Sequence, residues 1–200
     1  ARIKQLGLVN ERLIAVHMTQ LTEGEIADCA THGVSIVHNV ESNMKLLSGF
    51  CPAEAIRRAG VNLAMGTDGC ASNNDLDLSG EMRSAALVGK LVAGDAAAMD
   101  AASVLRAATM GSARALGWTD RIGSIEVGKQ ADLVAVDLDT IESQPVYNVI
   151  SQLIYAASRH QVSDVWIGGE RKLRERRLID IDTAEILAKA RRWQARIAST

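Results

Sequence analysis

Aromatic residues make up only 3% of the 200-residue chain, and no apolar run reaches the roughly 18 residues of a membrane-spanning helix. The scarcity of Trp, Tyr and Phe argues against a base-stacking surface or an aromatic cage, because both need several aromatic rings close together. Without a long apolar run no transmembrane helix is expected, and no secretory signal pattern is visible near the first residue. We therefore do not expect the chain to act at a membrane.

Cysteine and excess positive charge are also scarce. The three cysteines, Cys29, Cys51 and Cys70, are odd in number and lack CxxC spacing, which argues against a disulfide framework and favours a reducing, cytoplasmic location. The net charge of −2 provides no basic field for nucleic acid. With 48% apolar and 23% charged residues, the composition is that of an ordinary globular protein with one large domain, or one with a small second domain.

Three short apolar runs each end in a titratable or strongly polar residue. Leu13–Val16 is followed by His17, Val34–Val37 by His38, and Asn62–Met65 by Gly66, Thr67 and Asp68. Brief apolar runs closed by polar residues and glycines are typical of buried parallel strands. Because the carboxyl ends of parallel strands share one edge of a sheet, we expect His17, His38 and Asp68 to face a common rim.

Helical signals separate these runs. Thr22 and Glu25 form a capping-box pattern ahead of a helix that ends near Gly33, and Pro52 precedes a helix over Ala53–Ala59. The alternation of strands and helices predicts an α/β fold with right-handed crossovers, as an open sheet or as part of a barrel. Residues 40–50 and the segment around Asn73 and Asn74 are interpreted as loops.

The second half of the chain has a different pattern. Helices are predicted for Leu78–Leu91 and, after a cap at Asp100, for Ala101–Leu116. Beyond Ile122, glycines separate runs rich in β-formers, and Gly168-Gly169 predicts a hairpin. We predict a domain over residues 1–120 and a β-rich domain over residues 121–200. The latter contains an inserted helix at Pro145–Ala157 and a closing helix at Asp182–Ala198.

The rim residues admit several interpretations. His17, His38 and Asp68 could together hold a zinc ion, or one of them could supply a single ligand to a site completed elsewhere. Alternatively, each residue could bond only to backbone at a strand end, in a non-enzymatic α/β binding module. Residue spacing alone does not decide between these possibilities.

Four segments resemble the amidohydrolase superfamily, in its branch of adenosine-type deaminases and triazine chlorohydrolases. They read AVHMTQLTEGEI (15–26), HNVESNMKL (38–46), GTDGCASNNDLDL (66–78) and IEVGKQADLV (125–134). The likeness is strongest to 5-methylthioadenosine/S-adenosylhomocysteine deaminases. It implies the carboxyl-terminal part of a (β/α)8 TIM-type barrel, followed by part of a small β-sandwich domain and a closing helix.

The resemblance also implies roles for individual residues. Asp68 is expected to bind a divalent metal, with zinc the expected ion, and to take a proton from the attacking water. His17 is expected to assist proton transfer, Ser72 to contact substrate, and His38, Ser42 and Asn43 to line the pocket. The family's HxH pair, a further metal-binding His and a catalytic Glu have no counterparts in this sequence and are expected upstream.

The resemblance therefore predicts a metal-dependent hydrolytic deaminase of adenosine-type nucleosides, with a triazine-type chlorohydrolase as the alternative. Its partners would be a small-molecule substrate and the amino-terminal half of the same enzyme, which completes the site. A cytoplasmic homo-oligomer is expected.

Overall fold

The computed structural model describes residues 2–199. Residues 1 and 200, the outer ends of the two predicted domains, lie outside the described part. The chain forms two compact units: one comprises the chain up to Lys129 together with Leu138–Gln161, and the other comprises Gln130–Asp137 and the chain from Val162 onward. The predicted division at residues 120 and 121 does not coincide with these units and stays a prediction.

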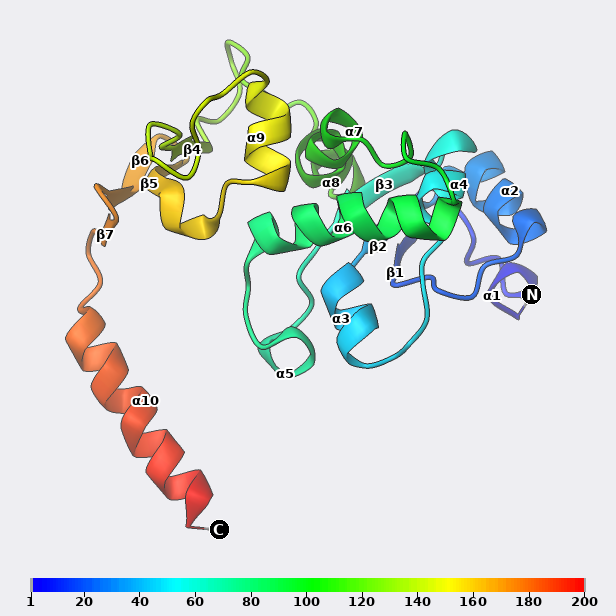
Figure 1. The fold of residues 1–200 in the computed structure, drawn as a ribbon. Helices are drawn as coiled ribbons and strands as arrows, with labels where there is room; N and C mark the ends of the chain where they lie inside the picture. Colours follow the sequence, from blue (N-terminus) through cyan, green and yellow to red (C-terminus); the bar gives the residue numbers. More distant parts are fainter. Residues whose placement is uncertain (1, 200) are drawn as a thin grey trace. The chain divides into compact units, whose positions relative to one another are not determined.

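The first unit contains a parallel sheet in the order β1-β2-β3, formed by Ile14–Val16, Ser35–His38 and Asn62–Met65 (Figure 1). Val16 is aligned with Val37, and His38 with Met65, so the carboxyl ends of the strands share one edge. This confirms the prediction of adjacent parallel strands and of a mixed α/β fold.

Helices connect these strands as the sequence signals indicated. α2 (Glu23–Thr31) joins β1 to β2 and begins with the predicted capping box between Thr22 and Glu25. Between β2 and β3, α4 (Ala53–Arg58) follows Pro52. The prediction that residues 40–50 are a loop is wrong, because α3 occupies Val40–Lys45. Asn39, a favoured N-cap residue, stands at the start of α3, but its side chain makes no capping hydrogen bond.

The remaining elements of the first unit extend the helical part. A short helix α1 (Arg2–Gln5) precedes β1, and α5 (Cys70–Asn73) replaces the predicted loop after β3. Helix α6 (Leu78–Ala93) packs against α3 and α4. The predicted helix after Asp100 consists of α7 (Ala101–Arg106), the π-helical turn η1 (Ala107–Gly111) and α8 (Ser112–Ala115) in succession.

The helix predicted at Pro145–Ala157 is shorter and packs differently from expectation. It spans only Val149–Tyr155 (α9), is capped by Asn148, and is followed by the 3-10 turn η2 (Arg159–Gln161). Although α9 is inserted between strands in the sequence, it packs against α6 and α7, where Ile154 is fully buried. Its apolar face therefore belongs to the core of the first unit.

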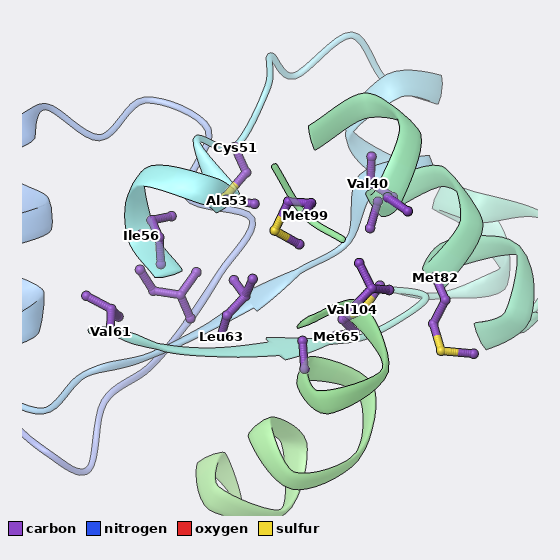
Figure 2. Close-up of a cluster of buried hydrophobic side chains, with 14 of the residues drawn as sticks. Val40, Cys51, Ala53, Ile56, Val61, Leu63, Met65, Met82, Met99 and Val104 are labelled. Carbon is purple, nitrogen blue, oxygen red and sulfur yellow. The ribbon is translucent and has the colours of Figure 1, made fainter. Parts of the chain in front are cut away.

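That core fills the space between the sheet and the helices of the first unit. Figure 2 shows Leu63 and Met65 of β3 beside Val104 of α7, with Ile56 of α4 and Met99 close by. Ile36, Ile56, Met99 and Val104 are each 0% exposed. Such a dense apolar contact fixes β3, and hence the residues that follow it, relative to the neighbouring helices.

The second unit is an antiparallel sheet in the order β4-β5-β6-β7, followed by a helix. The strands are Leu133–Val136, Val162–Ile167, Glu170–Arg174 and Arg177–Leu178. The predicted hairpin at Gly168-Gly169 is confirmed, with Ile167 paired to Glu170 and positive φ at both glycines. The closing helix is confirmed as α10 (Thr183–Ala198), and Asp182 caps it. No helix within residues 2–199 combines the length and apolarity that a membrane span requires.

Candidate active site

His17 and Asp68 meet at the carboxyl edge of the parallel sheet. His17 directly follows β1, where its backbone N–H donates to the Val37 carbonyl at 3.0 Å, and Asp68 lies three residues beyond β3. Both adopt left-handed backbone conformations, with φ values of +69° and +62°. His17 Nε2 lies 3.8 Å from Asp68 Oδ2. Other non-glycine residues of the chain also have positive φ, so it is the short distance between an imidazole and a carboxylate at the carboxyl edge that makes this pair the starting point for function.

The Asp68 carboxylate is held by donors on both of its oxygens. Ser42 Oγ donates to Oδ2 at 2.6 Å, and the Gly69 N–H donates to Oδ1 at 2.8 Å. Hydrogen bonds from Ser42, then Ser72, then the Gly69 backbone lower the pKa of Asp68 below its ordinary value. A carboxyl group with an ordinary pKa is already ionised at neutral pH, and these donors further stabilise and orient the charged form, so Asp68 presents a fixed anion that can act as a ligand or accept a proton.

Asn43 fixes the tautomer of His17. His17 Nδ1 lies 2.9 Å from Asn43 Oδ1, and since an amide oxygen can only accept, Nδ1 carries the hydrogen. In the neutral imidazole the lone pair is therefore on Nε2, the atom that faces Asp68. α3 thus contributes two neighbouring side chains, Ser42 to Asp68 and Asn43 to His17. Both residues are almost completely buried, at 0% and 2% exposure.

His38 does not join this pair. It ends β2 but is only 2% exposed, and no hydrogen bond or ion pair within residues 2–199 links its side chain to His17 or Asp68. Burial lowers the pKa of His38 to about 4, so the imidazole is neutral. Its Nδ1 and the Nδ2 of Asn43 are buried without a partner in the described structure. Two unsatisfied polar atoms near the rim indicate a place for a further polar group.

Ser72 lies in the short helix α5, immediately beyond the Asp68 turn. Its Oγ donates to the Gly69 carbonyl at 3.0 Å, and it also contributes to the lowered pKa of Asp68. The residue is half-buried, so its hydroxyl is placed where it could exchange this local bond for one to a ligand. The structure therefore brings Ser72, Ser42, Asn43, His17 and Asp68 together.

The donor set of a metal site is only partly present. Within residues 2–199 no three His, Cys, Asp or Glu side chains form a cluster suited to a metal ion. The anionic Asp68 carboxylate and the free lone pair of His17 Nε2 suit zinc chemically, but a zinc site needs at least three protein ligands. This chain can therefore contribute a ligand to a zinc site that is completed elsewhere. The complete site of His17, His38 and Asp68 that the sequence allowed is not formed among the described residues.

Glu81 is an additional polar residue that the sequence pattern did not single out, and it contacts Asn73, which was interpreted only as part of a loop. Glu81 in α6 is 0% exposed and accepts a hydrogen bond from Asn73 Nδ2 at 2.8 Å. Asn73 Nδ2 also donates to the carbonyl of Thr67, the residue before Asp68. One signal was available: Glu81 is adjacent to Met82 on the buried stripe of an amphipathic helix, a position where an apolar residue is expected.

Comparison with known proteins places the chain in a defined group. The model of the Amidohydrolase family matches residues 1–172. A protein named 5-methylthioadenosine/S-adenosylhomocysteine deaminase from Teredinibacter turnerae is 46% identical over 198 residues, which are 99% of this chain and 45% of that protein. A protein of the same name from Saccharophagus degradans is 42% identical over 98% of this chain and 44% of its own length.

Solved structures give the same picture. An adenosine deaminase from Xanthomonas campestris with bound zinc is 67% identical, with a TM-score of 0.98 over 100% of this chain and 45% of that chain. The zinc complex of atrazine chlorohydrolase from Arthrobacter aurescens is 28% identical, with a TM-score of 0.88 over 94% of this chain and 42% of its own. The chain thus spans less than half the length of these relatives.

Proposed function

The chain belongs to the amidohydrolase family, and we propose that it forms the carboxyl-terminal part of a zinc-dependent hydrolytic deaminase that acts on 5-methylthioadenosine or S-adenosylhomocysteine. The observation that carries this proposal is the pair of His17 Nε2 and Asp68 Oδ2, 3.8 Å apart at the carboxyl edge of three parallel strands. That edge is where α/β barrels carry their catalytic residues. The curated relatives described above support the choice of substrate.

The remainder of the barrel has to come from outside this chain. Three parallel strands cannot close a (β/α)8 barrel, which takes about 250 residues. We infer that the other strands and the other zinc ligands come from the part of the enzyme that this chain does not contain. The antiparallel sheet of the second unit would be one side of a small β-sandwich. We expect a soluble cytoplasmic homo-oligomer.

In this enzyme Asp68 would be the residue of this chain that holds zinc. When bound, zinc would act as a Lewis acid and lower the pKa of water to about 7. Asp68, whose carboxylate is held in place by Ser42 and Gly69, accepts the proton from the attacking water. His17 presents the Nε2 lone pair on the same side, because Asn43 holds the Nδ1 hydrogen, and it assists the proton transfer to the departing amine. Ser72 provides a hydrogen bond to the nucleoside.

Two substitutions in the full-length protein test these roles. Asp68→Asn preserves the shape and tolerates the positive φ, but it removes the charge, so zinc content and kcat should both fall. Loss of a general base alone costs about 100- to 10,000-fold in kcat. His17→Asn also tolerates its positive φ and should lower kcat while zinc is retained. Ammonia release from 5-methylthioadenosine and zinc content measured by mass spectrometry provide the two readouts.

Asp120→Asn is the matched control, because Asp120 is exposed in the segment after α8 and its loss changes the net charge equally. It should retain full zinc and normal turnover. Full zinc and near-normal turnover in Asp68→Asn would contradict the assignment, and absence of zinc from the wild type would favour a non-enzymatic binding module.

The structural likeness to atrazine chlorohydrolase supports a second candidate, hydrolysis of a chlorotriazine. The same His17 and Asp68 pair could promote loss of chloride in place of ammonia. Chloride release from a chlorotriazine, measured beside ammonia release from 5-methylthioadenosine and adenosine, decides between them. A preference for the chlorotriazine would leave the residue roles intact and replace the deaminase assignment.

A further inference from the structure

A fully buried carboxylate joins the two parts of the site that hold Asp68 and His17. Glu81 lies in the first turn of α6, which packs against α3, and α3 packs against α5 (Figure 1). It is 0% exposed, and within residues 2–199 no ion pair links it to Lys, Arg or His. Burial, together with the nearby charges of Glu41 and Asp75, raises the pKa of Glu81 to about 7, while hydrogen bonds from the backbone of Glu41 and Val40 favour the charged form.

One Glu81 oxygen supports the segment that carries Asp68. Asn73 Nδ2 donates both to Glu81 Oε1 and to the Thr67 carbonyl, at 2.8 Å in each case. Thr67 directly precedes Asp68, whose φ of +62° requires the backbone to be held by its surroundings. The bridge from Glu81 through Asn73 to Thr67 restrains the backbone at this point.

The other Glu81 oxygen supports the helix that carries Ser42 and Asn43. The Glu41 N–H donates to Glu81 Oε2 at 3.3 Å, and the Val40 N–H also interacts with the Glu81 carboxylate. These are the first two residues of α3, a helix whose own N-cap residue, Asn39, supplies no side-chain bond. Ser84 in α6 adds a second link by donating to Glu41 Oε1 at 2.7 Å. Glu81 therefore caps α3 from a neighbouring helix.

We propose that Glu81 is a positioning residue of the active site. It does not touch His17 or Asp68; it aligns them through Asn73 and Thr67 on one side and through α3 on the other. Every group directed at its carboxylate is a hydrogen-bond donor: the amide of Asn73 and the N–H groups of Glu41 and Val40. Only a group with two accepting oxygens satisfies both sides at once. This inference rests on the proposed deaminase function.

Glu81→Gln in the full-length enzyme tests the proposal. The amide has nearly the same size, but its NH2 group must face one of these donors, so one side of the bridge fails. Loss of a group that orients metal ligands typically costs about 10- to 100-fold in metal affinity or activity. We expect kcat to fall by about that factor with KM little changed, and zinc to pass more readily to a competing chelator.

Glu54→Gln is the matched control. Glu54 is also a buried glutamate of the first unit, at 4% exposure, but its carboxylate bonds Arg57, Arg58 and the Met99 N–H and not the residues of the rim. It should lower stability and leave kcat and zinc affinity near wild type well below its melting temperature. Equal loss of kcat in both variants would show that general destabilisation explains the effect and would overturn the proposal.

Asn73→Ala provides an independent route, because it breaks the bridge without changing the buried carboxylate. If Glu81 acts through Asn73, the effects of the two substitutions on kcat should be strongly non-additive in the double variant. Asn73→Ala also carries the test if Glu81→Gln fails to fold. Normal kcat and normal zinc affinity in either single variant would overturn the proposal.

A failure of the proposed deaminase function can be distinguished from a failure of the positioning role of Glu81. If the wild type binds zinc but releases no ammonia from any nucleoside, the deaminase assignment is wrong. The positioning role is then judged on zinc affinity alone, which Glu81→Gln should lower and Glu54→Gln should not.

Discussion

Glu54 offers a quantitative prediction about the stability of the unit that carries the site. Its carboxylate accepts bonds from Arg57 at 2.7 Å, from Arg58 at 2.6 Å and from the buried Met99 N–H at 3.1 Å. Hydrogen bonding from Arg57, assisted by Met99 and Arg58 and opposed by burial, lowers the pKa of Glu54 from 4.5 to about 2. The ion pairs therefore stabilise the folded state whenever Glu54 is charged.

The size of the effect follows from linkage. One pKa unit is worth about 1.4 kcal/mol, so a change from 4.5 to about 2 corresponds to about 3 kcal/mol. The side chains of Arg57 and Arg58 are 40% and 60% exposed, and solvent screening reduces this to about 2 kcal/mol. Because the folded-state pKa is depressed, this stability is present above pH 4.5 and is lost as the pH falls toward about 2.

The assay is urea unfolding of Glu54→Gln and wild type, followed by circular dichroism between pH 2 and pH 7. The unfolding free energy of the wild type should exceed that of Glu54→Gln by about 2 kcal/mol at pH 7, and this difference should decrease progressively below pH 4.5. Glu170→Gln is the control, since Glu170 is 74% exposed and its loss changes the net charge equally. A gap that is the same at pH 2.5 and pH 7, or one that Glu170→Gln reproduces, would refute the reasoning.

Two further substitutions test packing and substrate contact. Gly111→Ala should destabilise the first unit by about 3 kcal/mol in urea unfolding, because its Cβ would lie 2.0 Å from the Leu63 carbonyl of β3. Gly24→Ala, which meets nothing within 4 Å, should have little effect, and equal losses in the two variants would contradict this account. Ser72→Ala should raise KM by about tenfold or less with kcat and zinc content retained, since one hydrogen bond shared by substrate and transition state is lost. A fall in kcat at unchanged KM would instead place Ser72 in the chemical step.

Local patterns in the sequence were sufficient for the strands of the parallel sheet and for the starts of several helices. The runs before His17 and His38, and the run Asn62–Met65, are short and apolar, and each is a strand because it fits a buried parallel sheet. The capping box at Thr22 and the Gly168-Gly169 turn were equally recognisable, since both depend on residues within a few positions of each other. The same local patterns predicted that His17, His38 and Asp68 would lie on one edge, although only His17 and Asp68 pair there and His38 is buried.

The alignment of that edge was decided by the tertiary structure. Ser42 and Asp68, like Asn43 and His17, are 26 residues apart, and Glu81 bonds the Glu41 backbone across 40 residues. No periodicity encodes such pairs, because they form only when the core places α3, α5 and α6 against one another. For the same reason α9 joined the helices of the first unit, where Ile154 is buried. Side chains distant in sequence become partners only through packing, and packing orients the Asp68 carboxylate and sets the tautomer of His17.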